Sequence, residues 1–223
     1  MSKKPISEAY NMDCIQGMKR YPDKYFDLAI VDPPYGLDKK LLGGNTGMMK
    51  NCFKEVIDKG WDEKPKMEYW YELFRCSKNQ IVWGGNYFID FLFPTQCFLV
   101  WDKMNGTNNM ADCELAWTSF QSSVRKFSMH HFSKGYGNKI HPTQKPIALY
   151  EWILKNYAKE GDKILDTHLG SGSSRIAAQK LGFDFCGFEI DKDYFEQGNE
   201  RFRKSIEMPL FDNVEIKKEV LLF

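Results

Sequence analysis

The residues Asp32, Pro33, Pro34 and Tyr35 form a short stretch whose types and order suit the holding of a planar amine. They follow the apolar run 28–31, which is predicted to be a buried parallel strand. Because proline has a fixed φ and no N–H, this strand must end there, at the edge where open α/β sheets bind ligands. The Asp32 carboxylate and the Pro33 carbonyl can together accept both N–H groups of an exocyclic amine, which frees the nitrogen lone pair for attack on an electrophile. Tyr35 can stack on the attached ring; the alternative is an ordinary strand-ending turn with a packed tyrosine.

A second stretch, residues 163–174, has the pattern of a strand, a glycine-rich turn and the start of a helix. Gly170 and Gly172 allow the backbone to approach a ligand closely, and a helix N-terminus offers free N–H groups to an anion. The next predicted strand, 185–191, carries Glu189, whose carboxylate can accept both hydrogen bonds of a ribose diol. The spacing matches neither a P-loop nor the full dinucleotide fingerprint. The turn and Glu189 together therefore favour a nucleoside cofactor over an ordinary strand–helix connection.

The order of these two motifs along the chain resembles the permuted beta group of amino-group DNA methyltransferases, which use S-adenosylmethionine. In that group the catalytic half comes first, a target-recognition segment follows, and the cofactor half closes the chain. The run from His141 to Pro146 matches the group's His-Pro-Thr-x-Lys-Pro motif, and the resemblance places Thr143 and Lys145 near the methionine carboxylate of the cofactor. It also implies that Asp13 accepts from the cofactor's adenine amine, with a surface aspartate at a strand end as the alternative. The cofactor-binding residues predicted in this way are Asp13, Cys14, Asp32, Thr143, Lys145, Asp166, Leu169, Gly170, Ser171, Gly172, Ser173 and Glu189.

The resemblance implies an α/β, Rossmann-like methyltransferase fold with a mostly parallel twisted sheet and a permuted motif order. Runs 98–101 and 114–118 are predicted to form an antiparallel hairpin within it. We expect a single methyltransferase domain over 1–223, with a catalytic half 10–118, a target-recognition segment 119–140, a cofactor half 141–206 and a tail 207–223. Residues 1–10 have the composition of a polar lead-in, and 119–140 show no clear period.

The charge distribution points to nucleic acid, although the net charge is only +1. No carboxylate lies between Glu114 and Glu151, or between Asp38 and Glu55. Two basic windows in a near-neutral chain indicate one positively charged face, although a solvated loop is the alternative for the second window. The predicted DNA-binding residues are Lys39, Lys40, Arg125, Lys126 and Lys134. The predicted partner is double-stranded DNA, whose target base must be flipped out of the duplex. A homodimer that shares the reading of the sequence is one alternative, beside a short recognition sequence or relaxed specificity.

The resemblance favours N6 of adenine as the methyl acceptor, because the tetrapeptide begins with Asp and Ser is commoner in the cytosine enzymes. N4 of cytosine stays open, as do an RNA or protein-glutamine methyltransferase and a non-catalytic nucleic-acid-binding subunit on the same fold. A restriction–modification setting is expected. The tail run 208–211 faintly resembles a clamp-binding peptide.

The cysteines suggest a reducing compartment and no metal site. The six cysteines include no C-x-x-C pair and no histidine at ligand spacing, so no structural metal is expected. Because no signal peptide or long apolar run is present, we expect a cytoplasmic protein without a membrane segment.

Overall fold

A computed structural model of the chain describes residues 4–37, 63–106, 111–130, 140–141 and 143–207. The predicted basic residues Lys39, Lys40 and Lys134 and the tail run 208–211 lie outside these described residues. No helix in the described ranges is long and apolar enough to cross a membrane.

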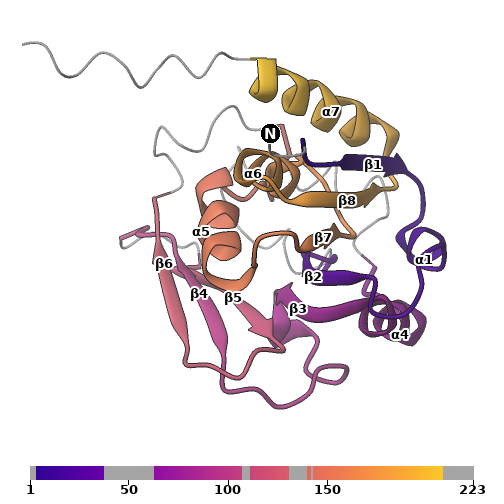
Figure 1. Cartoon of the computed structure of the whole chain (residues 1–223). Coiled ribbons are helices and arrows are strands. Elements are labelled where there is room, and N and C mark those ends of the chain that lie inside the picture. Colours follow the sequence, from indigo (N-terminus) through magenta and orange to yellow (C-terminus); the bar gives the residue numbers. More distant parts are fainter. Residues whose placement is uncertain (1–3, 38–62, 107–110, 131–139, 142, 208–223) are drawn as a thin grey trace, which may run out of the picture.

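The described residues form one eight-stranded sheet with the order β1-β8-β7-β2-β3-β5-β4-β6 (Figure 1). Its strands are β1 Ser7–Asn11, β2 Phe26–Val31, β3 Ser77–Trp83, β4 Phe98–Asp102, β5 Cys113–Thr118, β6 Arg125–Ser128, β7 Lys163–Asp166 and β8 Asp184–Glu189. All neighbouring strands are parallel except β5, which runs antiparallel to both β3 and β4. The expectation of a mostly parallel α/β sheet with an antiparallel hairpin is confirmed.

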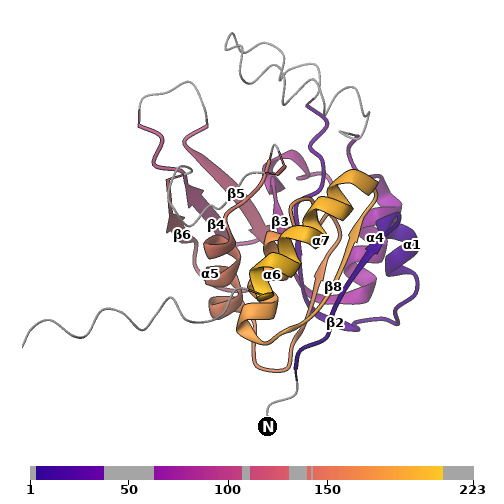
Figure 2. The same ribbon diagram turned by 90° about the horizontal axis from the view of Figure 1, so that it is seen from above.

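Helices cover both faces of this sheet, as the alternation along β2 requires. Leu28 and Ile30 belong to a core that also contains residues of α5 (Ile147–Tyr157) and α6 (Ser173–Leu181). Ala29 and Val31 point to the opposite core, which contains residues of α1 (Cys14–Met18) and α4 (Met67–Cys76). A strand buried on both faces reads as a continuous apolar run, which is the pattern of 28–31. Helix α7 (Lys192–Glu207) contacts α6, β1 and β8 (Figure 2).

Two segments differ from the sequence predictions. The expected polar lead-in 1–10 contains β1, which pairs with β8 in parallel from Ser7 onward. The expected irregular segment 119–140 contains β6, an edge strand parallel to β4. Arg125 and Lys126 are exposed there and only Phe127 packs inward, against Trp152 at 5.7 Å between ring centroids. A four-residue edge strand with one inward side chain produces no detectable period, because alternation needs several repeats.

Candidate functional site

The strand register brings four acidic residues to one edge of the sheet. Asn11 of β1 lies opposite Glu189, Asp166 lies opposite Gly187, and Ala29 of β2 lies opposite Leu165. Because β1, β8, β7 and β2 are all parallel, their carboxyl ends meet at one edge, and the segments that follow them share it. Asp13, Asp32, Asp166 and Glu189, predicted from separate motifs, therefore lie at this edge.

The Asp32 carboxylate is held on both oxygens. The Tyr35 hydroxyl donates to Asp32 Oδ1 at 2.7 Å, and the Lys145 ammonium donates to Asp32 Oδ2. Burial and the nearby Asp32 carboxylate raise the pKa of Tyr35 well above its ordinary value, so the phenol stays a hydrogen-bond donor. The Tyr35 ring stacks on Tyr87, with centroids 4.7 Å apart and planes 21° apart, and meets Phe88 edge-on. Stacking of Tyr35 on a target base stays a prediction.

Gly84 makes room for the Tyr35 ring. It follows β3 directly, has φ +67°, and a Cβ built on it would lie 2.2 Å from Tyr35 Cε1. No side chain fits at that distance, so the position of the Tyr35 ring depends on glycine at residue 84. The Gly84-Gly85 pair after an apolar run was the only sequence signal of this contact.

We expect Gly84→Ala to lower methyl transfer at least about tenfold, because the added methyl displaces Tyr35 and with it a hydrogen bond to Asp32. Cofactor affinity should change much less, since Gly84 follows β3 and the glycine turn follows β7, on the other side of β2. Steady-state kinetics and calorimetric titration measure the two effects. Gly106→Ala is the matched control: its φ of +69° carries the same backbone strain, but no atom of the described residues lies within 4 Å of its Cβ position. Equal losses in the two variants would refute the contact as the cause.

Lys145 lies at the turn that contains Asp32. Its side chain is 3% exposed and also contacts Glu114 Oε2 of β5 at 3.1 Å. Thr143, from the same motif, bonds through Oγ1 to His141 Nδ1 at 3.1 Å, and a Cβ on Gly170 would meet the His141 ring at 3.5 Å. The motif therefore connects the glycine turn to Asp32. The placement of Thr143 and Lys145 at a methionine carboxylate stays a prediction.

The glycine turn is fixed by hydrogen bonds from both sides. Gly170 and Gly172 have φ values of +47° and +70°, which favour glycine. The Gly170 N–H donates to Glu189 Oε2 at 2.8 Å, and the Asp191 N–H donates to Glu189 Oε1 at 2.9 Å. Burial raises the pKa of Glu189 above its ordinary value. Each carboxylate oxygen keeps a second lone pair, so Glu189 can still accept from a ribose hydroxyl.

Three side chains of the predicted cofactor set pack within the turn itself. Leu169 packs so closely on β8 that a Cβ on Gly187 would lie 2.5 Å from Leu169 Cδ2. Ser171 and Ser173 are buried with their hydroxyl oxygens 3.2 Å apart. Arg201 of α7 donates to the Ser171 carbonyl at 2.8 Å and to Ser173 Oγ at 2.9 Å. These residues shape the turn, and Arg201 is a contribution that sequence reasoning missed.

Asp166 is buried beneath the turn, with 2% of the residue exposed. Its carboxylate binds the start of α6. The Ser174 hydroxyl donates to Oδ2 at 2.5 Å and the His168 N–H donates to Oδ1 at 3.0 Å. Burial nevertheless raises the pKa of Asp166 to about 7. Burial also lowers the pKa of His168 to about 4, so its ring is neutral where it bonds to Thr167 Oγ1 at 2.9 Å.

Asp166→Asn is expected to raise the melting temperature, and by more at pH 8 than at pH 5. The pKa of this carboxyl is higher in the folded protein than in the unfolded chain, so the stability of the fold falls as pH rises from about 4 to about 7. Above pH 7 the protein bears the full free-energy cost of an ionised, buried Asp166. That cost is on the order of 2 to 4 kcal/mol at pH 8. Asparagine does not ionise, can accept from the His168 N–H, and can donate to Ser174. Thermal unfolding at both pH values, with the exposed Asp90→Asn as control, measures the effect; equal shifts at both pH values would contradict it.

Asp13 and Cys14 lie at the start of α1. Asp13 caps this helix, because its Oδ1 accepts from the Gln16 N–H at 2.9 Å. Burial, with Asp13 and Glu189 nearby, raises the pKa of Cys14 to about 12, so this thiol is not a nucleophile at neutral pH. The capping bond gives Asp13 a structural role and leaves Oδ2 available to a ligand amine.

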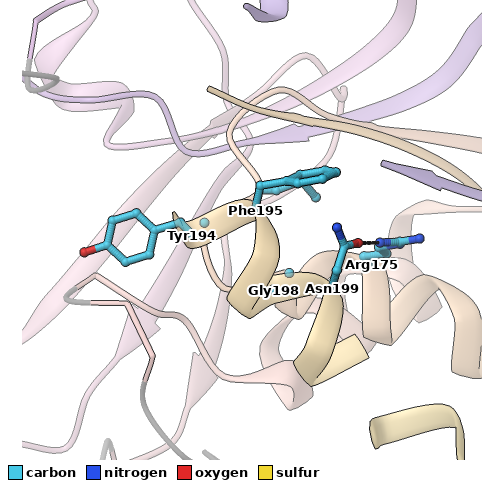
Figure 3. Close-up of a pocket in the computed structure, with 8 residues that line it drawn as sticks. Arg175, Tyr194, Phe195, Gly198 and Asn199 are labelled. Carbon is cyan, nitrogen blue, oxygen red and sulfur yellow. Dashed lines mark hydrogen bonds between the residues drawn. The ribbon is translucent and has the colours of Figure 1, made fainter. Parts of the chain in front are cut away.

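A small cavity lies between the glycine turn, α6 and α7. The space in which the centre of a water molecule can lie is about 10 Å³, which is enough for roughly one water molecule. Figure 3 shows Arg175 and Asn199 meeting at its wall, where the guanidinium donates to Asn199 Oδ1 at 2.6 Å. The lining residues are Leu169, Gly170, Gly172, Arg175, Tyr194, Phe195, Gly198 and Asn199. This cavity, as lined by the described residues, is too small for a nucleoside.

Of the predicted DNA-binding residues, Arg125 and Lys126 are described. Both are exposed on the edge strand β6, and Lys126 forms an ion pair with Asp102 at 3.1 Å. Within the described ranges, no three His, Cys, Asp or Glu side chains gather in a geometry that could hold a metal ion.

Solved structures with the same architecture identify the fold. The complex of M1.HpyAVI with SAM covers 87% of this chain and 98% of its own, with a TM-score of 0.59 and 22% identity. PvuII DNA methyltransferase, described as cytosine-N4-specific, covers 91% of both chains with a TM-score of 0.60 and 15% identity. The chain has the fold of the S-adenosylmethionine-dependent methyltransferases. At these identities the likeness shows the methyltransferase fold alone.

Sequence comparisons give matches to DNA methyltransferases. A family model described as DNA methylase, for N6 and N4 methyltransferases, matches residues 97–200. The type II methyltransferase M.HpaI of Haemophilus parainfluenzae is 24% identical over 232 residues, covering 85% of this chain and 72% of the relative. The type II methyltransferase M2.DpnII of Streptococcus pneumoniae is 24% identical over 233 residues, covering 85% and 87%. These matches support an amino-group DNA methyltransferase that uses S-adenosylmethionine.

Proposed function

We propose that the chain transfers a methyl group from S-adenosylmethionine to the N6 amine of adenine in double-stranded DNA. One observation carries the proposal: the Asp32 carboxylate, fixed by Tyr35 and Lys145, lies at the same sheet edge as the glycine turn and Glu189. An amine acceptor beside a nucleoside-binding turn suits methyl transfer from a nucleoside cofactor to an amino group.

The residues at this edge fit the cofactor. Glu189 offers acceptors for the ribose hydroxyls, and Asp13 Oδ2 offers one for the adenine amine. The glycine turn presents backbone at positive φ where a side chain would obstruct a ligand. We propose the set predicted above as cofactor-contacting or turn-forming, with Leu169, Ser171 and Ser173 in the second role. Lys145 is set apart from it, because its ammonium contacts Asp32 and Glu114.

Asp32 and the Pro33 carbonyl orient the target amine by accepting its N–H groups, so that its lone pair is directed out of the base plane. S-adenosylmethionine supplies the methyl group: the nitrogen–carbon bond forms as the carbon–sulfur bond breaks, and that electron pair stays on sulfur. The positive charge then lies on the amine, which releases one proton to water. Because Asp32 holds the amine rather than forming a bond to it, no covalent enzyme intermediate is required.

We further propose a permuted, beta-group enzyme of a restriction–modification system that acts in the cytoplasm on flipped bases. The described cysteines are free thiols, in keeping with a reducing compartment. Arg125 and Lys126, together with Lys39, Lys40 and Lys134, are proposed to contact DNA phosphates. A homodimer that shares the reading of the sequence is part of the proposal.

N4 of cytosine is the second candidate, because a cytosine-N4-specific enzyme shares the fold with a TM-score of 0.60. Adenine is preferred because the tetrapeptide begins with Asp32.

The test is transfer of labelled methyl from S-adenosylmethionine to unmethylated duplex DNA, followed by nucleoside analysis. Label in N6-methyladenine is the expected result. Label in N4-methylcytosine would keep the mechanism and reverse the choice of base. Cofactor binding without transfer to DNA would refute the proposal and favour RNA, protein, or a non-catalytic nucleic-acid-binding subunit.

A further inference from the structure

A buried network of alternating charges connects the catalytic turn to the antiparallel hairpin. Lys145 contacts Asp32 and Glu114, and Lys103 at the end of β4 contacts Glu114 Oε1 at 2.6 Å. Lys103 and Glu114 are also well covered, with side chains 15% and 26% exposed. The order is therefore carboxylate, ammonium, carboxylate, ammonium, with no net charge.

The Lys145 ammonium has little freedom within this network. Its side chain is 3% exposed, and Nζ lies 5.2 Å from the centroid of the fully buried Trp83 ring. An ammonium removed from water needs compensating charge, which Asp32 and Glu114 supply. Attraction to both raises the pKa of Lys145 above its ordinary value despite burial, so the group stays an ammonium.

The same contacts fix the Asp32 carboxylate. Lys145 occupies Oδ2, whereas Oδ1 is bound only by the movable hydroxyl of Tyr35 among the contacts described above. A carboxylate anchored through one oxygen cannot rotate about its Cβ–Cγ bond without losing a buried ion pair. Oδ1 is then the oxygen that remains available to an incoming amine.

We propose that Lys145 is a positioning residue that orients Asp32 for the target amine, and that Glu114, itself held by Lys103, fixes Lys145. This inference rests on the proposed function, since it concerns the same site. It gives Lys145 a role at the methyl acceptor instead of the cofactor's carboxylate.

Kinetics of Lys145→Met test the role, because methionine keeps the length of the side chain and removes its charge. We expect kcat to fall about 100-fold while KM for S-adenosylmethionine changes less than about threefold. Glu114→Gln should lower kcat about tenfold, and Lys145→Arg should recover part of the loss. A rise in KM for S-adenosylmethionine of tenfold or more, with kcat retained, would overturn the inference in favour of cofactor binding.

A stability measurement separates this inference from the proposed function, because it needs no activity. Asp32→Asn and Lys145→Met should each change the melting temperature, and the double variant should change it by clearly less than the sum. Lys126→Met, whose partner Asp102 lies on the surface, should be additive with Asp32→Asn. Additive shifts for Asp32 and Lys145 would overturn the network even in an active enzyme. Coupled shifts in a protein without methyl transfer would keep the network and refute the proposed reaction. If Lys145→Met does not fold, Lys103→Met paired with Asp32→Asn provides the same test two contacts further along the network.

Discussion

Replacing Asp32 by alanine is expected to reduce methyl transfer at least about 100-fold while cofactor affinity stays within about tenfold. The carboxylate is the acceptor that orients the target amine, and no other carboxylate bonds to both Tyr35 and Lys145 in the described part of the chain. Its removal also leaves the ammonium of Lys145 with Glu114 as its remaining anion. Single-turnover methylation and calorimetric titration of the cofactor measure the two quantities.

Asp32→Asn is the matched variant for this prediction, because it keeps the shape of the turn and one acceptor oxygen. We expect its loss to be smaller than that of alanine. Equal losses of methyl transfer and of cofactor affinity in Asp32→Ala would mean that Asp32 mainly supports the cofactor.

Replacing Glu189 by alanine is expected to weaken cofactor binding about 10- to 100-fold, the usual loss for hydrogen bonds to a charged group. The change removes the proposed acceptor for the ribose, and it also frees the N–H groups of Gly170 and Asp191 that now fix the turn. Calorimetric titration measures the affinity. Glu151→Ala, which removes only a partly exposed carboxylate paired with Lys180, is the control.

The pH dependence of cofactor binding gives an independent check on Glu189. Its pKa is raised by burial, so protonation begins at a higher pH than for an ordinary glutamate and removes an acceptor from the ligand. The dissociation constant of the native protein should therefore rise as pH falls through this raised pKa. Glu189→Gln, which does not titrate, should bind more weakly at neutral pH and show a flatter profile. A parallel profile for the two proteins would exclude Glu189 as the titrating acceptor.

The sequence by itself determined the ends of two central strands and the two motif turns, although it missed β1 and β6. The run 28–31 ends in two prolines, and residues 163–166 precede two glycines, so both strands have unambiguous ends. Helix α5 begins at Ile147, directly after Pro146, because a proline disfavours the helical conformation in the residue before it. These features depend on residues that are neighbours in the sequence, so they can be predicted without knowledge of the tertiary contacts.

Only the tertiary structure decided which side chains meet. Lys145 and Asp32 are 113 residues apart and come together because α5 and β7 return the chain to the middle of the sheet, beside β2. Glu114 reaches the same place because β5 inserts between β3 and β4, an order that hydrophobic period does not specify. The close approach of the Tyr35 ring to Gly84 is likewise visible only in the tertiary structure. Parallel strands are joined by long crossovers, so strand order and register, rather than local pattern, set these contacts.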